Sequence, residues 1–361
     1  MTQTTAPPPR AARSTEFAVE TDGLRKTYHT RKGTQVAVEG LDLKVPSGGV
    51  HGFLGPNGSG KTTTIRMLLG LIRADSGEMR LFDQPVPQAL PQVIGRIGAI
   101  VEQPRFFPAF SGRKNLALLA QGIGAPSSRV AEVLDEVGLG ARGRDRFRTY
   151  SLGMKQRLAI AGTLLKDPEL LIFDEPTNGL DPAGIHEIRA TMRGLADSGK
   201  TVLVSSHILS EVQLVADTVS IIGRGRLLAT GQVDEILASA DSHTVRVGVA
   251  EPQRAAQVLQ AAGFLVTPSG PLLTVGIRDK TQRFEPSRVT RVLAQQGLFV
   301  SELTPVRADL ESVFLDLTAE EHLGATQHPH PGAVPTGPPP GPPGSAGPSP
   351  QPGPGANGGA R

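Results

Sequence analysis

Two hydrophobic patterns recur along residues 17–240, and together they predict an α/β domain. Short unbroken apolar runs, such as Leu170–Phe173, are typical of strands that are buried on both faces of a parallel sheet. Segments of helical periodicity lie between these runs. One such helix is predicted to begin at Pro182, because Asp181 provides an N-cap carboxylate and proline favours the first helical position.

Residues 243–320 repeat one pattern at an offset of 34 residues, which predicts a second, smaller unit. The sequence Gly263-Phe264-Leu265-Val266 is echoed by Gly297-Leu298-Phe299-Val300. Each copy consists of a short helix, a glycine stop and a strand, and an alternating strand precedes it. The resulting β-α-β, β-α-β order predicts a ferredoxin-like α+β domain. A last helix near Asp309–Leu317 is expected to close this unit.

Composition narrows the class of protein. The chain has 361 residues, more than a single core usually holds, which also favours two domains. Cysteine is absent, so disulfides, thiolate zinc sites and cysteine nucleophiles are excluded. The formal net charge is only +3 and the chain shows no block of clustered lysine and arginine, so we expect no nucleic-acid partner.

The two ends of the chain differ from its middle. Residues 1–16 lack the apolar stretch of a secretory signal and are expected to form a short disordered arm. Residues 324–361 are dominated by proline, glycine, alanine and serine, which predicts a disordered tail. No apolar run approaches the roughly 18 residues that cross a bilayer. A membrane role would therefore require a partner.

A glycine-rich loop follows the predicted strand Gly49–Leu54 and precedes a predicted helix, Thr62–Leu71. The loop matches the motif G-x-x-x-x-G-K-[ST] with Gly55, Pro56, Asn57, Gly58, Ser59, Gly60, Lys61 and Thr62. Its backbone N–H groups are expected to bind phosphate oxygens, Lys61 the β- and γ-phosphates, and the Thr62 hydroxyl Mg²⁺. A dinucleotide-binding G-x-G-x-x-G is excluded because Thr63 takes the place of the last glycine. The sequence therefore predicts a nucleoside triphosphate site.

Two carboxylates, Asp174 and Glu175, follow the apolar run Leu170–Phe173 directly. Asp174 is expected to hold Mg²⁺, directly or through water, and Glu175 to accept a proton from the attacking water. The alternative is that the pair only caps the segment after the strand. The phosphate loop earlier in the chain favours hydrolysis.

One segment indicates which family of nucleotide-binding proteins the chain resembles: Tyr150-Ser151-Leu152-Gly153-Met154-Lys155-Gln156-Arg157. It resembles the signature sequence of ATP-binding cassette (ABC) proteins, in which Ser151 and Gly153 would offer a hydroxyl and bare N–H groups to phosphate. Read alone, the segment fits a capped amphipathic helix equally well. Its position between the phosphate loop and Asp174 favours the signature.

The resemblance covers about residues 17–318 and implies a P-loop NTPase fold, with a RecA-like core and antiparallel β and helical subdomains. It implies ATP and Mg²⁺ as cofactors. By the same resemblance, Asp181 lies in the loop that crosses to a partner cassette, and His207 is the switch histidine that contacts the γ-phosphate. Tyr28 would stack on adenine. The alternatives are a structural histidine and a surface tyrosine at the end of a strand.

One position departs from the family pattern. The family has a glutamine after a strand, two residues before a proline, that senses Mg²⁺ and the transporter partner. Here Glu102 takes that place, and Gln103 is next to it. Either the ligand is a carboxylate, which also suits Mg²⁺, or a shift of one residue brings in Gln103.

The form of the signature and the small C-terminal unit are similar to those of bacterial type-2 exporters of drugs, antibiotics and sodium. This resemblance implies a homodimer or heterodimer of cassettes that share ATP between Lys61 of one copy and Ser151 of the other. It also implies a separate membrane permease at the cytoplasmic face of the membrane, contacted through the loop Glu102–Phe110. The aromatic side chains of Phe106, Phe107 and Phe110 in this loop fit a docked partner helix and ordinary core packing equally well. An importer ATPase, or a soluble cassette that acts on ribosomes or DNA, remains the alternative.

Overall fold

The computed structural model describes residues 15–30, 33–102, 105–239, 244–277, 284–305 and 309–325. The predicted arm, residues 1–16, and the predicted tail, residues 324–361, lie almost wholly outside these ranges. The helices and strands described below belong to one compact unit that ends at Ala319, except for the end of the last helix.

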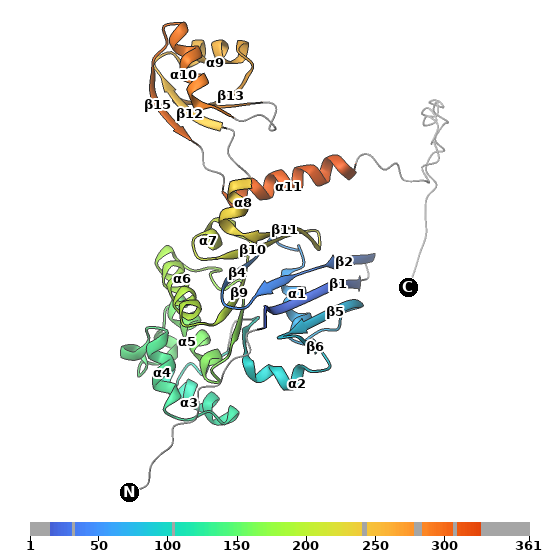
Figure 1. The fold of residues 1–361 in the computed structure, drawn as a ribbon. Coiled ribbons are helices and arrows are strands. Elements are labelled where there is room, and N and C mark those ends of the chain that lie inside the picture. Colours follow the sequence, from blue (N-terminus) through green and yellow to red (C-terminus); the bar gives the residue numbers. More distant parts are fainter. Residues whose placement is uncertain are drawn as a thin grey trace, which may run out of the picture. The chain divides into compact units, whose positions relative to one another are not determined.

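A six-stranded sheet forms the centre of the first domain (Figure 1). Its order is β11-β10-β4-β9-β8-β7, and all neighbours are parallel except β10 and β11. The strands are β4 (Gly49–Leu54), β7 (Ile97–Ile100), β8 (Leu170–Asp174), β9 (Thr201–Ser206), β10 (Thr218–Gly223) and β11 (Arg226–Gln232). All six residues of β9 are buried, as expected of a strand covered on both faces. The carboxyl ends of β4, β8 and β9 therefore meet at one edge.

A second, antiparallel sheet packs on one side of helix α1 (Lys61–Leu68). Its strands are β1 (Phe17–Thr30), β2 (Gly33–Leu41), β3 (Lys44–Pro46), β5 (Ser76–Leu81) and β6 (Gln84–Val86). Ile65, Met67 and Leu68 of α1 share one core cluster with this sheet and with Phe53 of β4. The short helices α2 (Leu90–Val93) and η1 (Ile94–Arg96) then lead into β7.

Helices α3, α4 and α5 gather as a separate group beside the six-stranded sheet (Figure 1). The helices of this domain after α2 are α3 (Gly112–Ile123), α4 (Arg129–Glu136), α5 (Leu152–Leu164), α6 (Pro182–Asp197), α7 (Leu209–Gln213) and α8 (Val233–Ser239). Two 3₁₀ turns, η2 (Gly140–Arg142) and η3 (Phe147–Thr149), precede α5. The predicted P-loop α/β fold, with antiparallel and helical subdomains, is confirmed.

Residues 244–305 form a four-stranded antiparallel sheet in the order β13-β14-β12-β15. In chain order the elements are β12 (Thr244–Val249), α9 (Pro252–Ala261), β13 (Phe264–Ser269), β14 (Leu272–Ile277), α10 (Pro286–Gln295) and β15 (Val300–Pro305). The glycines that follow the two helices, Gly263 and Gly297, have positive φ values of 89° and 71°. The predicted repeat and the ferredoxin-like arrangement are confirmed.

The last helix, α11 (Leu310–Ala325), does not pack as the sequence suggested. We expected it to close the C-terminal unit, but Leu310 and Val313 belong to the core cluster of the first domain and not to that of residues 244–305. The backbone N–H of Leu310 also donates to Gln213 Oε1 of α7 at 2.9 Å. The apolar face of an amphipathic helix can pack on either hydrophobic core. The sequence pattern alone therefore does not show which core α11 joins.

Replacing Leu310 with alanine should therefore destabilise the first domain. Leu310 is fully buried, and removing a buried leucine side chain costs about 2–5 kcal/mol of the free energy of unfolding. Chemical denaturation of the full chain measures the change. Leu315→Ala, in the same helix but 61% exposed, is the matched control and should change it by no more than about 0.5 kcal/mol. Equal effects of the two substitutions would contradict this packing.

Candidate functional site

The glycine-rich loop connects β4 to α1, and its backbone passes close to two neighbouring strands. A Cβ atom at Gly55 would lie 2.3 Å from the carbonyl oxygen of Ile222, and one at Gly60 would lie 2.5 Å from that of Ala37. Only glycine fits without movement of a backbone. The Ser59 hydroxyl is buried and has no hydrogen-bond partner among the described residues. Because buried polar atoms are nearly always paired, the loop offers an unused donor to a ligand.

The side chains of Lys61, Glu175 and His207 form a connected chain at the edge of the sheet. Lys61 Nζ donates to the carbonyl oxygens of Gly55 at 2.6 Å and Pro56 at 3.2 Å, and it lies 3.3 Å from Glu175 Oε1. The other carboxylate oxygen, Oε2, lies 2.6 Å from Nδ1 of His207. Lys61 is 5% exposed, so its charge is little screened. The three predicted catalytic side chains are thus in contact.

Contacts of the Glu175 backbone, as well as those of its side chain, fix the position of this residue. It has a positive φ of 50°, a conformation that costs free energy for a residue other than glycine. Its backbone N–H donates to Ser205 Oγ at 3.0 Å, and that hydroxyl in turn donates to Asp174 Oδ1. Ser205 of β9 therefore links the carboxylate of Asp174 to the backbone of Glu175 at the end of β8. The sequence analysis missed this residue, because a serine at the end of an apolar strand gives no signal of its own.

A cavity of about 380 Å³ opens beside these carboxylates. Asp174, Glu175 and Glu102 all line it. Glu102 is largely exposed and pairs with Arg66 of α1 at 3.2 Å, a contact that the sequence did not predict. The alternative candidate, Gln103, lies outside the described residues. The structure thus places a carboxylate, Glu102, on the same cavity as the predicted magnesium ligand Asp174.

Tyr28 lies near the end of β1. Its ring is 36% exposed, and Lys26 Nζ lies 5.7 Å from the ring centroid. Asp75 fixes this part of the strand, because it accepts from Lys26 Nζ at 2.8 Å and from the Thr27 backbone N–H at 2.6 Å. The hydrogen bond from Lys26 lowers the pKa of Asp75 below its usual value. Tyr28 therefore offers an exposed aromatic face on a fixed strand.

Ser151 and Asp181 are both helix N-caps. The Ser151 hydroxyl accepts from the Met154 N–H at 3.2 Å at the start of α5, and Asp181 Oδ1 accepts from the Gly184 N–H at 3.0 Å at the start of α6. A Cβ at Gly153 would lie 3.4 Å from the Cα of Gly184, so the two helix starts are adjacent. In the described part of the single chain, Ser151 has no hydrogen bond to the phosphate loop.

His51 is a buried histidine on the strand that leads into the loop, and its surroundings give it a structural role. It lies on β4, with Nδ1 2.8 Å from Thr218 Oγ1 and Nε2 3.0 Å from Ser220 Oγ. Burial lowers its pKa to about 3, so the ring stays neutral at physiological pH. His207, in contrast, is partly exposed and contacts a carboxylate.

Most of the chain is similar in sequence to known proteins. Residues 38–178 match the ABC transporter family. The chain is 36% identical over 304 residues to the bacitracin transport ATP-binding protein BcrA of Enterococcus faecalis, which covers 84% of this chain and 96% of that protein. The chain belongs to the ABC transporter ATP-binding proteins. It is therefore an ATP-binding and ATP-hydrolysing cassette.

Two further similarities extend over the same cassette. The chain is 36% identical over 310 residues to the Nod factor export ATP-binding protein I of Cupriavidus metallidurans, covering 82% of this chain and 96% of that protein. The solved structure of cbiO1 from Clostridium perfringens, part of the ABC transporter complex cbiONQ, is 28% identical with a TM-score of 0.56. That likeness covers 63% of this chain and 92% of cbiO1. Subunits of this family dimerise and work with a separate membrane permease.

The residues present also fit the nucleotide and its metal. The loop supplies bare N–H groups, a buried ammonium and the unused Ser59 hydroxyl for phosphate. The oxygens of Thr62, Asp174 and Glu102 are of the type that Mg²⁺ prefers. No helix in the described ranges is long and apolar enough to cross a membrane.

Proposed function

We propose that this chain is the ATPase subunit of an exporter whose membrane-spanning part is a separate polypeptide. The contact chain from Lys61 through Glu175 to His207 supports the hydrolysis step. The transport and export proteins to which the chain is similar over nearly their whole length support the exporter class. An importer ATPase or a cassette acting on ribosomes or DNA has no such support.

Each side chain takes a distinct role in this proposal. Lys61 binds the β- and γ-phosphates, and the N–H groups from Gly55 to Thr63 bind the remaining phosphate oxygens. Glu175 accepts the proton of the attacking water, and His207, on its other carboxylate oxygen, holds it in place and senses the γ-phosphate. Mg²⁺, held by Thr62, Asp174 and Glu102, would neutralise charge on the phosphates. Tyr28 stacks on adenine.

The active unit is a dimer in which the two copies share each nucleotide. The Ser151 hydroxyl and the first N–H groups of α5 would close the site of the partner copy, and Asp181 lies in the loop that crosses between them. An interface of this kind uses one surface twice. Two identical copies satisfy it, and a closely related second cassette would also do so. Binding of ATP closes the dimer, and hydrolysis opens it again.

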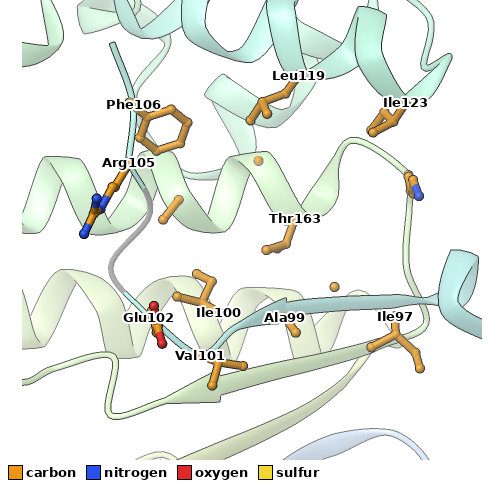
Figure 2. Close-up of a pocket in the computed structure, with 14 residues that line it drawn as sticks. Ile97, Ala99, Ile100, Val101, Glu102, Arg105, Phe106, Leu119, Ile123 and Thr163 are labelled. Carbon is orange, nitrogen blue, oxygen red and sulfur yellow. The ribbon is translucent and has the colours of Figure 1, made fainter. Parts of the chain in front are cut away.

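A second cavity, of about 390 Å³, suits the membrane partner (Figure 2). It lies between β7, α3 and α5, and Glu102 lies at its edge, as it does at the edge of the catalytic cavity. Phe106, Leu119 and Ile123 form an apolar wall. Phe106 packs on Phe147, with ring centroids 5.2 Å apart, whereas Phe107 is 60% exposed. A helix of the permease, at the cytoplasmic face of the membrane, would dock here.

Leu119→Glu should release the chain from membranes without loss of its own hydrolysis. A carboxylate on the wall of the cavity would be desolvated by a docked helix, which is strongly unfavourable. The measurement is cofractionation with membranes of cells that also express the permease, after a wash with high salt, and ATPase activity of the purified chain. We expect membrane recovery to fall at least about tenfold.

Leu118→Glu is the matched control. Leu118 and Leu119 are similarly exposed, 40% and 43%, and they are adjacent in α3, but only Leu119 lines the cavity. Leu118→Glu should therefore stay with the membranes. Full membrane recovery of Leu119→Glu, or release of the wild type by the salt wash, would refute docking at this cavity.

A further inference from the structure

Seven exposed basic side chains lie in two segments of the chain, one of which borders the cavity of about 390 Å³ through Arg105. We call them the basic surface: Arg105, Arg113, Lys114, Arg142, Arg144, Arg146 and Arg148. They belong to two segments that are linked to each other by backbone hydrogen bonds. The N–H of Arg113 donates to the carbonyl oxygen of Gly143 at 2.8 Å, and that of Arg148 to Pro108 at 3.1 Å. Ser111 and Arg146 form an isolated β-bridge.

Almost no acidic side chain balances this charge. Within the described ranges, an ion pair forms only between Arg142 and Asp145, at 2.5 Å, and the other six basic side chains have no acidic partner. Like charges on adjoining segments repel each other and raise the local potential. Arginine is also the side chain best suited to bind phosphate in pairs of hydrogen bonds. The surface therefore suits a partner that carries many anionic groups.

Exposed apolar side chains adjoin the same surface. Phe107, 60% exposed, lies 5.3 Å from Phe110 between ring centroids, and Lys114 Nζ lies 4.6 Å from the Phe110 centroid. Leu119 follows along α3. Aromatic and aliphatic side chains beside cations are typical of surfaces at the boundary between lipid headgroups and acyl chains. A soluble polyanion would contact the basic side chains and leave the apolar ones exposed to water.

We propose that the basic surface binds the phosphate groups of anionic membrane lipids. The inference rests on the proposed docking of a permease, because Arg105 and Leu119 line that cavity and a docked chain would carry its neighbouring surface close to the bilayer (Figure 2). Lipid binding would strengthen the association of the cassette with the permease. They would also limit how far the dimer can tilt away from the membrane as it opens.

The test is flotation of the full chain with lipid vesicles. Vesicles of phosphatidylcholine alone are compared with vesicles in which about one third of the lipid is phosphatidylglycerol. Each basic side chain near an anionic surface favours binding by about fivefold. The triple variant Arg144→Glu, Arg146→Glu, Arg148→Glu should thus lose at least about tenfold in binding to the anionic vesicles. All three side chains are exposed, so its thermal midpoint should stay unchanged.

The control variant, Arg25→Glu, Arg80→Glu, Arg291→Glu, makes the same charge change at exposed positions away from the basic surface. It should bind as the wild type does, and wild-type binding should fall steeply as salt rises. Absence of a preference for phosphatidylglycerol, or an equal loss in the control, would overturn the proposal. Tighter binding to a DNA duplex or to polyglutamate than to the vesicles would also overturn it.

Membrane recovery of Leu119→Glu, measured as described above, separates this proposal from permease docking. Release of Leu119→Glu together with no binding of the wild type to anionic vesicles would refute the lipid surface and leave docking intact. Vesicle binding by the wild type together with full membrane recovery of Leu119→Glu would support the lipid surface and refute docking at the cavity.

Discussion

Replacing Glu175 with glutamine should lower the rate of ATP hydrolysis by about 10²–10⁴-fold, the usual contribution of a general base. The amide cannot accept the proton of the attacking water. It can still donate or accept hydrogen bonds, and the backbone N–H that bonds Ser205 is unchanged. Nucleotide binding should therefore persist, because Lys61, Thr62 and Asp174 remain. Steady-state phosphate release, with a parallel measurement of ATP affinity, separates the two effects.

The same variant should form an ATP-dependent dimer. Uncut ATP would stay between the phosphate loop of one copy and Ser151 of the other, so the protein should elute as a dimer in size-exclusion chromatography with ATP. Adding Ser151→Arg should abolish that dimer, because a bulky cation replaces the N-cap hydroxyl at the start of α5. Hydrolysis near the wild-type rate, or a monomeric ATP-bound Glu175→Gln, would show that the shared-site mechanism is wrong.

Lys61→Met should be nearly as damaging, for a different reason. Methionine keeps the length and the apolar stem, but it removes a buried ammonium that contacts Glu175 and two loop carbonyls. Loss of one group that stabilises developing charge costs about 10²–10³-fold in rate. Here ATP affinity should fall as well, because the same charge binds the ground-state phosphates. Calorimetric titration with ATP and the hydrolysis rate are the two measurements.

Lys200→Met is the matched control for this substitution. Lys200 is also largely buried, with 15% of its side chain exposed, and its Nζ pairs with Asp167 at 2.7 Å. It lies before β9, at the amino end of the strand and away from the loop. Its loss should affect stability and leave ATP affinity unchanged. Equal losses of affinity in both variants would mean that Lys61 acts through folding and not through phosphate binding.

The local parts of the site were predictable because each motif carries its own backbone context. Gly55–Thr62 lies between a strand and a helix, and Asp174 follows an unbroken apolar strand. Parallel strands end at a common edge, so the loop and the carboxylates were expected to meet. The contact of Glu175 with His207 followed because β8 and β9 are neighbours in the sheet. The ferredoxin-like repeat could be predicted for a similar reason, because its alternating strands and the glycines that end its helices are local sequence signals.

Features that depend on long-range pairing were not predictable. The docking of Leu310 and Val313 on the first domain is one example, because their helical pattern fits either core. The basic surface is another, since it arises from hydrogen bonds between residues 108–113 and 143–148. Ser205 joins Asp174 to Glu175 only because two strands lie side by side. In each case the physical cause is tertiary packing, which no local pattern encodes.

Because α11 packs on the first domain, a premature stop codon before α11 would affect the first domain as well as the ferredoxin-like domain. The ferredoxin-like domain lies between α8 and α11 in the chain, so it is an insertion in the gene and not a terminal appendage. A nonsense mutation anywhere from 244 to 309 would remove α11, and before residue 305 it would also truncate that domain, so the core residues that Leu310 and Val313 cover would be exposed. The phenotype of such an allele would report misfolding of the cassette. Only an in-frame excision that keeps α11 can reveal what the inserted domain does.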